Sequence, residues 1–186
     1  MVLEILFFIV QCIYLFLPAA FANMAPVLFK NWFKFLKKPI DMKKEYNNKR
    51  IFGANKTWRG LLMAVIFAII IVAIQKQLFM DYPSWGNLSL INYEYINIWL
   101  VGLLFGLGAI VGDLIESFFK RQINIKEGKS WIPFDQMDWI VGALIFTIFL
   151  GFYTPAILLV ILIAFPLLHV LFSYIGYKLK LKKDKF

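Results

Sequence analysis

The sequence predicts an all-α integral membrane protein with five transmembrane helices. Of its 186 residues, 61% are hydrophobic and the mean hydropathy is +0.74, which is more apolar surface than a water-soluble domain of this length needs. Most of the apolar stretches approach the roughly 20 residues that a helix needs to cross hydrocarbon. They cover about residues 5–29, 60–80, 97–118, 138–153 and 156–177. We therefore predict a single membrane-embedded domain, residues 1–186.

The first stretch contains two prolines around a polar residue. Pro18 and Pro26 flank Asn23, and each proline removes a helical hydrogen bond and kinks the chain. Two interpretations stay open: a kink of the kind that membrane helices tolerate, or a groove in which freed backbone and Asn23 face a headgroup or base. Cys12 is the only cysteine in the chain, which excludes a disulfide framework and a thiolate metal site.

A polar segment bracketed by glycines, residues 53–60, leads into the second stretch. It places Lys56, Thr57 and Arg59 within four residues of one another. A lysine supplies a point charge and an arginine matches phosphate oxygens bidentately, so this pattern indicates phosphate binding. The alternative is a basic topology anchor, which is the interpretation we favour for most of the basic run from Lys34 to Arg50.

Glycines recur along the third stretch. The pairs Gly102/Gly106 and Gly108/Gly112 place small residues four positions apart, a spacing that allows close helix contact. That contact can lie within the subunit or across a homodimer. Because no strand precedes them, these glycines do not form a nucleotide-binding fingerprint.

Carboxylates gather where the third stretch ends and the fourth begins. Asp113, Glu116 and Lys120 have helical spacings and share one face. An aspartate at the centre of a membrane helix costs roughly 2.5–3.5 kcal/mol on insertion scales, so acids beside lipid indicate a functional site. A salt-bridged helix end is the alternative, and it explains Glu116 with Lys120 but not the deeper Asp113.

Asp135 and Asp138 open the fourth stretch and bring a second pair of acids to the same depth. Mg²⁺ prefers carboxylates, waters and substrate phosphates as ligands. We therefore predict a Mg²⁺ site at this level, with Asp113 and Asp135 as the firmest candidates. Arg121 begins the connecting loop in this interpretation, and the segment Lys126 to Lys129 indicates a loop that can close over a triphosphate.

The fourth and fifth stretches abut through residues 151–155, which contain a glycine and a proline and predict a tight turn in a helical hairpin. His169 lies alone in the fifth stretch. A single histidine there is more typical of a hydrogen-bonded interior residue than of a catalyst.

The basic residues predict the orientation. All of the 20 Lys and Arg residues except Lys76 lie in segments 30–59, 119–137 and 178–186. With five spans these segments fall on one side, which the positive-inside rule makes cytoplasmic. The N-terminus is then outside and the C-terminus inside. Topology thus explains the net charge of +9, and no nucleic-acid partner is needed.

At these motifs the chain resembles the CDP-archaeol synthase family and, more distantly, the phosphatidate cytidylyltransferases. The resemblance runs nearly end to end, through residues 17–26, 53–60, 112–121, 133–138 and 169–177. Two departures from the wider pattern favour the archaeal branch. A glycine-histidine-glycine segment is missing between Pro133 and Asp135, and Glu127 stands where aspartate is usual, which leaves its role open.

The resemblance implies an enzyme of the plasma membrane with a cytoplasmic active site. It would join CTP to the phosphate of an isoprenoid glycerol phosphate lipid, 2,3-bis-O-(geranylgeranyl)-sn-glycerol 1-phosphate, giving CDP-archaeol and pyrophosphate with Mg²⁺ required. Two alternatives stay open. The lipid could be phosphatidic acid, or the chain could be a cation-conducting protein without enzymatic activity, which predicts charges spread through the depth of several spans.

The expected site residues fall into two groups. Metal ligation is expected of the four acids, Asp113, Glu116, Asp135 and Asp138, and Lys120 joins them as a catalytic residue. Substrate binding is expected of Lys56, Thr57, Arg59, Arg121, Lys126 and Asn23.

Overall fold

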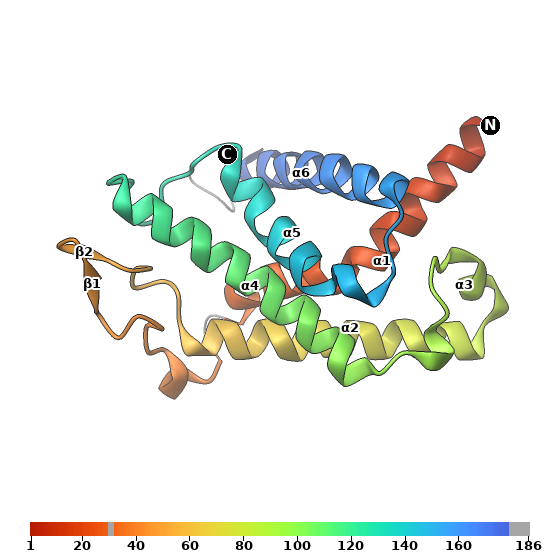
Figure 1. Ribbon diagram of the computed structural model, residues 1–186, viewed down its shortest axis with the longest axis horizontal. Coiled ribbons are helices and arrows are strands. Elements are labelled where there is room, and N and C mark those ends of the chain that lie inside the picture. The colour runs from red at the N-terminus through yellow and green to blue at the C-terminus, as the bar shows by residue number, and fades with distance from the viewer. Residues whose placement is uncertain (30–31, 179–186) are drawn as a thin grey trace.

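The computed structural model of the chain describes residues 1–29 and 32–178, and most of them are helical (Figure 1). The long helices are α1 (Val2–Leu28), α2 (Trp58–Asp81), α4 (Ile98–Gln122), α5 (Phe134–Thr147) and α6 (Pro155–Lys178). Short elements connect them: η1 (Lys34–Leu36), β1 (Glu45–Tyr46), β2 (Lys49–Arg50), α3 (Pro83–Leu88), η2 (Tyr93–Tyr95) and η3 (Ile148–Leu150). The predicted helical class is confirmed, and the antiparallel β1–β2 pair is the exception among the described residues.

Within the described residues, three helices are long and apolar enough to cross a membrane: α1, α2 and α4, with 27, 24 and 25 residues. A shorter apolar section covers Pro155–Leu171 of α6. Helix α5 has 14 residues, fewer than the roughly 20 that span hydrocarbon. A membrane protein with several spans is thus supported, while the count of five and the orientation stay predictions.

An aromatic cluster joins four of the helices at the centre of the bundle. Phe16 of α1 lies with its ring centroid 5.6 Å from Phe105 of α4, 6.1 Å from Trp139 of α5 and 5.3 Å from Phe165 of α6. All four side chains are buried. Helix α1 continues through Pro18, which is also buried in this core.

The glycines of α4 allow the backbones of neighbouring helices to approach closely. A Cβ on Gly102 would lie 2.5 Å from the Cα of Ile69 in α2, and one on Gly108 would lie 2.8 Å from the Cα of Ala143 in α5. Gly106 faces α2 and Gly112 faces α5 in the same way. These pairs therefore serve packing within the subunit, and the homodimer remains a prediction.

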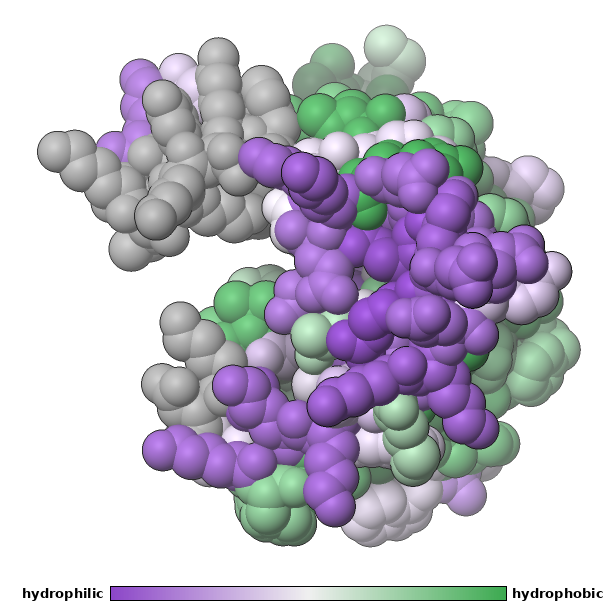
Figure 2. All heavy atoms as spheres, turned by 90° about the vertical axis from the view of Figure 1, so that its left-hand side faces the viewer, coloured by the Kyte–Doolittle hydropathy of each residue, from purple (hydrophilic) through white to green (hydrophobic). Residues whose placement is uncertain are grey.

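Two of the basic segments meet at one end of the bundle, which we call the polar end. Lys49 of β2 donates a hydrogen bond of 2.5 Å to the carbonyl oxygen of Gln122, the last residue of α4. The N-terminus and α3 lie at the opposite end (Figure 1). Viewed from the left of Figure 1, the polar end presents mainly hydrophilic residues (Figure 2). The described parts of the basic segments 30–59 and 119–137 thus lie at the same end of the bundle, as the charge pattern predicts. Residues 179–186 of the basic tail lie outside the described residues.

Candidate active site

Helices α4 and α5 bring three carboxylates together at the polar end. Asp113, Glu116 and Asp138 each offer one oxygen within 4.8 Å of the others. The close approach depends on glycines, because a Cβ on Gly112 would overlap the carbonyl oxygen of Asp138, and one on Gly142 would overlap the carbonyl oxygen of Gly108. The α4–α5 contact therefore places Asp138 opposite the two acids of α4.

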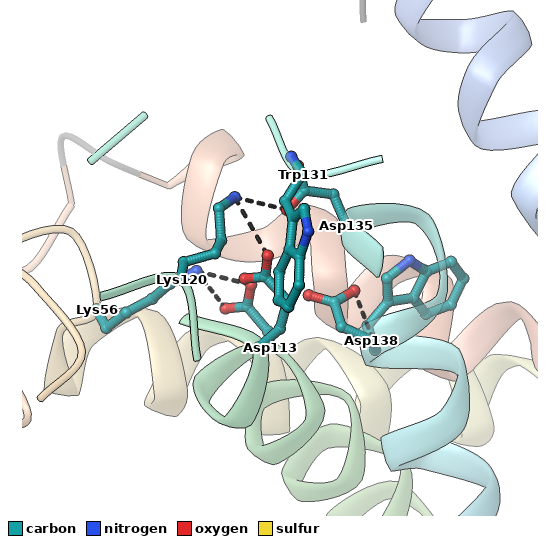
Figure 3. Close-up of polar contacts among 8 residues, drawn as sticks. Lys56, Asp113, Lys120, Trp131, Asp135 and Asp138 are labelled. Carbon is teal, nitrogen blue, oxygen red and sulfur yellow. Dashed lines mark hydrogen bonds and ion pairs between the residues drawn. The ribbon is translucent and has the colours of Figure 1, made fainter. Parts of the chain in front are cut away.

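Two lysines hold acids of this region in ion pairs, as Figure 3 shows. Lys56 lies with its Nζ 2.6 Å from both carboxylate oxygens of Asp113. Lys120 lies 2.6 Å from Oδ1 of Asp135 and 3.2 Å from Oε1 of Glu116. The backbone N–H of Trp131 donates to the other oxygen of Asp135 at 2.6 Å. Asp135 is thus held by Lys120 and Trp131 and lies outside the group of three, although it and Asp113 were the firmest metal-site candidates from sequence.

The group of three has the chemistry of a divalent-cation site. It supplies only carboxylate oxygens, the donors that Mg²⁺ prefers, and Glu116 is 7% exposed while the other two acids are half-buried. Nitrogen or sulfur donors, which would favour zinc or copper, are not part of this group. The residues present therefore fit a hard cation such as Mg²⁺.

Two cavities meet at the Lys56–Asp113 pair. The first, about 280 Å³, is predominantly polar and is lined by residues of the 51–56 segment, α4 and the 127–135 segment, among them Ser117, Lys120, Arg121 and Lys129. The second, about 400 Å³, lies between the end of α1, the start of α2 and residues 110–114 of α4. It is lined by Asn23, Pro26, Val27, Ile40, Thr57, Arg59, Gly60, Leu61, Ile110 and Leu114. Asn55, Lys56 and Asp113 line both. A charged compartment and a more apolar one thus share one ion pair.

A buried aspartate organises the segment that carries Lys56. The carboxylate of Asp41 accepts hydrogen bonds from the backbone N–H groups of Lys43, Phe52 and Gly53, and it pairs with the guanidinium of Arg50. Burial alone would raise the pKa of Asp41, but the Arg50 guanidinium and the three N–H donors outweigh it and hold the pKa below its usual value. Asp41 is therefore an ionised hub for the 41–53 turn.

Further backbone contacts fix Lys56 and its neighbours. The N–H of Ile40 donates to the carbonyl oxygen of Lys56 at 2.8 Å, and the N–H of Trp58 donates to that of Lys38 at 3.1 Å. Thr57 caps α2, with its hydroxyl oxygen accepting from the N–H of Gly60 at 3.2 Å. Segments 38–40 and 56–58 thus run side by side at the start of α2.

Glu127 links the α4–α5 connection to the Lys56 segment. Its Oε1 accepts from the N–H of Ala54 at 3.0 Å. Gly53 has a positive φ of 106°, and a Cβ there would lie 2.8 Å from the same Glu127 oxygen, so a side chain would oppose both the backbone conformation and the contact. Glu127, whose role the sequence left open, thus connects two loops through this hydrogen bond.

The other expected residues divide between the cavities and the surface. Asn23 and Arg59 line the second cavity, while Lys120 and Arg121 lie on the last turn of α4 rather than in the following loop. Lys126 is exposed and lines neither cavity, and Lys129 lines the first instead. Sequence reasoning did not single out Asp41, Asn55, Ser117 or Lys129. Two signals could have found some of them: the glycine-bracketed segment contains Asn55, and the loop expected to close over a triphosphate contains Lys129.

Fold and site together define a membrane-embedded helical protein whose acid-and-lysine cavity suits an enzyme that handles phosphate groups at the membrane surface. The chain belongs to the CarS-like family of CDP-archaeol synthases, whose family model matches residues 3–186.

Individual relatives agree with this family. CDP-archaeol synthase of Pyrococcus furiosus is 35% identical over 94% of this chain and 96% of its own length. The Methanosarcina mazei protein of the same name is 35% identical over 79% of this chain and 89% of its own. A solved structure described as an intramembrane enzyme for archaeal membrane lipids biosynthesis superposes with a TM-score of 0.70 at 28% identity, covering 87% of this chain and 91% of that one.

Proposed function

We propose that this chain transfers the cytidylyl group of CTP to 2,3-bis-O-(geranylgeranyl)-sn-glycerol 1-phosphate, giving CDP-archaeol and pyrophosphate. Membership of the family supports the reaction. The observation that carries the assignment of the site is the meeting of a charged and a more apolar cavity at Lys56 and Asp113. A nucleoside triphosphate and a lipid phosphate must come into contact for this reaction, and Lys56 and Asp113 line both cavities.

The reaction needs no nucleophile from the protein. An oxygen of the lipid phosphate attacks the α-phosphorus of CTP, a new P–O bond forms, and the bond from that phosphorus to the bridging oxygen of pyrophosphate breaks. The electron pair of that bond leaves with pyrophosphate. Positioning and charge stabilisation carry most of the catalysis in phosphoryl-type transfers, and the residues of the site supply these two functions.

Mg²⁺ is the proposed cofactor, held by Asp113, Glu116 and Asp138, whose oxygens converge. Its contribution would be to neutralise charge on the reacting phosphates. Asp135 is proposed as an adjacent acid that acts through Lys120, since those two side chains are paired at 2.6 Å. This refines the expectation that all four acids ligate the metal.

The cationic side chains are proposed to hold the triphosphate. Lys120, Arg121 and Lys129 line the first cavity, and Lys56 lies between the two substrates. Arg59, Thr57 and Asn23 line the second cavity, where they can contact the lipid headgroup. Its apolar residues, Val27, Leu61 and Leu114 among them, are suited to the first carbons of the isoprenoid chains, whose remainder stays in the bilayer.

The polar end is proposed to face the cytoplasm, where CTP is available. Its basic segments satisfy the positive-inside rule, and the chain is proposed to cross the plasma membrane five times as one domain. The cation-conducting alternative predicts charges along the depth of several helices, whereas the described ion pairs of the bundle gather at the polar end, apart from the pair at the N-terminus.

The function can be tested with purified protein in detergent, labelled CTP, Mg²⁺ and two lipids in parallel, the archaeal diether phosphate and phosphatidic acid. We expect CDP-lipid and pyrophosphate from the diether only. Product from phosphatidic acid alone would keep the mechanism and overturn the lipid. Folded protein that neither binds CTP nor yields product would refute the enzyme assignment.

The site is tested by replacing one acid of the group. Asp138→Asn should lower turnover by at least 10²-fold and raise the Mg²⁺ concentration needed for half-maximal rate, because it removes a charged ligand. Glu94→Gln, at the opposite end of the bundle, is the matched control and should leave both quantities unchanged. Equal Mg²⁺ dependence of Asp138→Asn and wild type would contradict the metal assignment.

A further inference from the structure

An exposed aromatic and basic segment follows α1 at the polar end. In residues 32–38 the side chains of Trp32, Phe33 and Phe35 are 57%, 45% and 73% exposed. The lysines interleaved with them, Lys34, Lys37 and Lys38, are also exposed. Three large apolar side chains with this much exposed surface call for a partner outside the bundle.

The segment is joined to the bundle near Trp32 and again at Lys38, while its aromatic side chains stay exposed. Phe29 packs on Phe67 of α2 with ring centroids 4.3 Å apart, and Trp32 packs edge-on against Phe29 at 5.2 Å. Beyond Trp32, the rings of Phe33 and Phe35 contact each other at 6.1 Å. Helix η1 lies beside the start of α2, at the lower left of Figure 1. A row of aromatic rings thus follows the end of α1, and three of them are exposed.

The last residue of this segment, Lys38, and the backbone after it contact the segment of Lys56. The carbonyl oxygen of Lys38 accepts from Trp58, and the N–H of Ile40 donates to the carbonyl oxygen of Lys56. Pro39 and Thr57 form an antiparallel bridge between the same two strands of chain. Residues 38–40 are therefore hydrogen-bonded to the stretch of chain that carries Lys56.

We propose that residues 32–38 are an interfacial anchor that docks on anionic lipid headgroups and sets the depth of Lys56 relative to the membrane surface. Aromatic rings favour the headgroup level of a bilayer, and lysines beside it are attracted to anionic lipids. Both occur here in alternation, directly after a helix that is apolar enough to cross the membrane. The coupling to catalysis rests on the proposed function, whereas the docking does not.

Charge complementarity identifies the partner as an anionic lipid surface rather than a second copy of the chain. Each lysine near an anionic surface strengthens association roughly fivefold. A second copy would bring the same three lysines to the same patch, because a twofold contact is formed by identical surfaces. Like charges would then face one another across the contact.

Docking is measured with a polarity-sensitive fluorophore on Phe35→Cys in a Cys12→Ala background. The full chain is reconstituted in vesicles of phosphatidylcholine, with or without a share of phosphatidylglycerol, which is not a substrate. We expect a blue shift of the emission with phosphatidylglycerol, reversed by high salt because screening weakens the attraction. The control probe on Tyr95→Cys, at the opposite end and 81% exposed, should not respond.

A charge variant separates the anchor from general basicity of the polar end. Lys34→Gln/Lys37→Gln/Lys38→Gln should abolish the phosphatidylglycerol response of the probe, whereas Lys43→Gln/Lys44→Gln, which removes two exposed lysines outside the segment, should retain most of it. The coupling predicts that CDP-lipid formation by wild type rises several-fold with phosphatidylglycerol. The triple variant should lack this rise while matching wild type in neutral detergent.

Three results would overturn the inference. The probe at position 35 could ignore phosphatidylglycerol, or the triple variant could respond as wild type does. The probe could also shift in detergent with rising protein concentration alongside a dimer mass, which would make a second copy the occupant. If the probe responds but no lipid yields product, the docking stands and the proposed function fails, so the two failures are distinguishable.

Discussion

Replacing Gly112 by alanine tests how the carboxylate group is assembled. The new Cβ would overlap the carbonyl oxygen of Asp138 and lie 3.1 Å from the Cα of Gly142. Both are backbone atoms, so relief requires α4 and α5 to separate by about 1 Å, and such overpacking costs about 1–3 kcal/mol. A misplacement of about 1 Å at a reacting centre costs on the order of 10²-fold in rate. We therefore expect Gly112→Ala to lower turnover about 10²-fold.

Gly102→Ala is the matched control for this prediction. Its Cβ would lie 2.5 Å from the Cα of Ile69 in α2, a comparable clash, but Gly102 precedes Gly112 by ten positions, or roughly 15 Å along the helix. Both variants should lose thermal stability in detergent, while only Gly112→Ala should lose most of its CDP-lipid formation and need more Mg²⁺. Equal losses of rate in the two variants, or normal turnover by Gly112→Ala, would refute the reasoning.

Further predictions concern the loops around the cavities. Asp41→Asn should cost about 1.5–3 kcal/mol at neutral pH because it weakens hydrogen bonds to a buried charge. Since the folded-state pKa of Asp41 is lowered, its stabilisation is present above about pH 4 and lost as the pH falls through that pKa, so melting temperatures of variant and wild type should converge in acid. Lys56→Met should lower kcat at least 10²-fold with a small change in melting temperature, because its pair with Asp113 is partly exposed. Glu127→Ala should raise KM for CTP several-fold, whereas Glu127→Gln, which keeps an acceptor for Ala54, should stay near wild type. Equal KM values for the two variants would contradict a role of this hydrogen bond in CTP binding. Lys129→Met should raise KM for CTP more than Lys126→Met does. The reverse order would indicate that Lys126, and not Lys129, contacts the phosphates.

The helices could be predicted from the sequence because lipid imposes a simple rule on it. A chain that crosses hydrocarbon must satisfy its backbone hydrogen bonds internally, so long apolar runs become helices. The runs at about 60–80 and 97–118 correspond to α2 and α4. Helix α2 extends a little beyond its run at both ends, and α4 extends beyond its run at the C-terminal end. Acids beside such runs are expensive, and this cost marked Asp113 and Glu116 as candidate site residues without any knowledge of tertiary structure.

The choice between Asp135 and Asp138 depended on information that local spacing does not carry. Both acids lie in the first turns of α5 and both face α4, but they meet different residues of it. The register is set by Gly112 and Gly142, which allow the two backbones to touch and turn Asp138 toward Asp113. Asp135 is instead turned toward Lys120, so the acid ranked higher from sequence is the one that holds a lysine.

Asp41 was hidden for a different reason. It lies in a basic loop, where an isolated acid is expected to form a weak surface pair, and its partners Phe52 and Gly53 donate through backbone N–H groups. Backbone donors leave no mark in the sequence. Lys129 was missed in favour of Lys126 because which lysine of a short loop faces a cavity depends on the path of the loop, here fixed by Glu127 at Ala54.

The interleaving of acids and lysines has a physical reason that neither group explains alone. Carboxylates at the edge of hydrocarbon are costly unless they are paired, and Lys56 and Lys120 provide that pairing for Asp113 and Asp135. A triphosphate with a divalent cation brings charges of both signs to the same place. In the proposed function each lysine can leave its carboxylate and pair with a phosphate of the nucleotide. The released carboxylate can then pair with the cation, so no charge is left unpaired. A site of lysines alone would bind the nucleotide, but it would lack the acids that the cation needs.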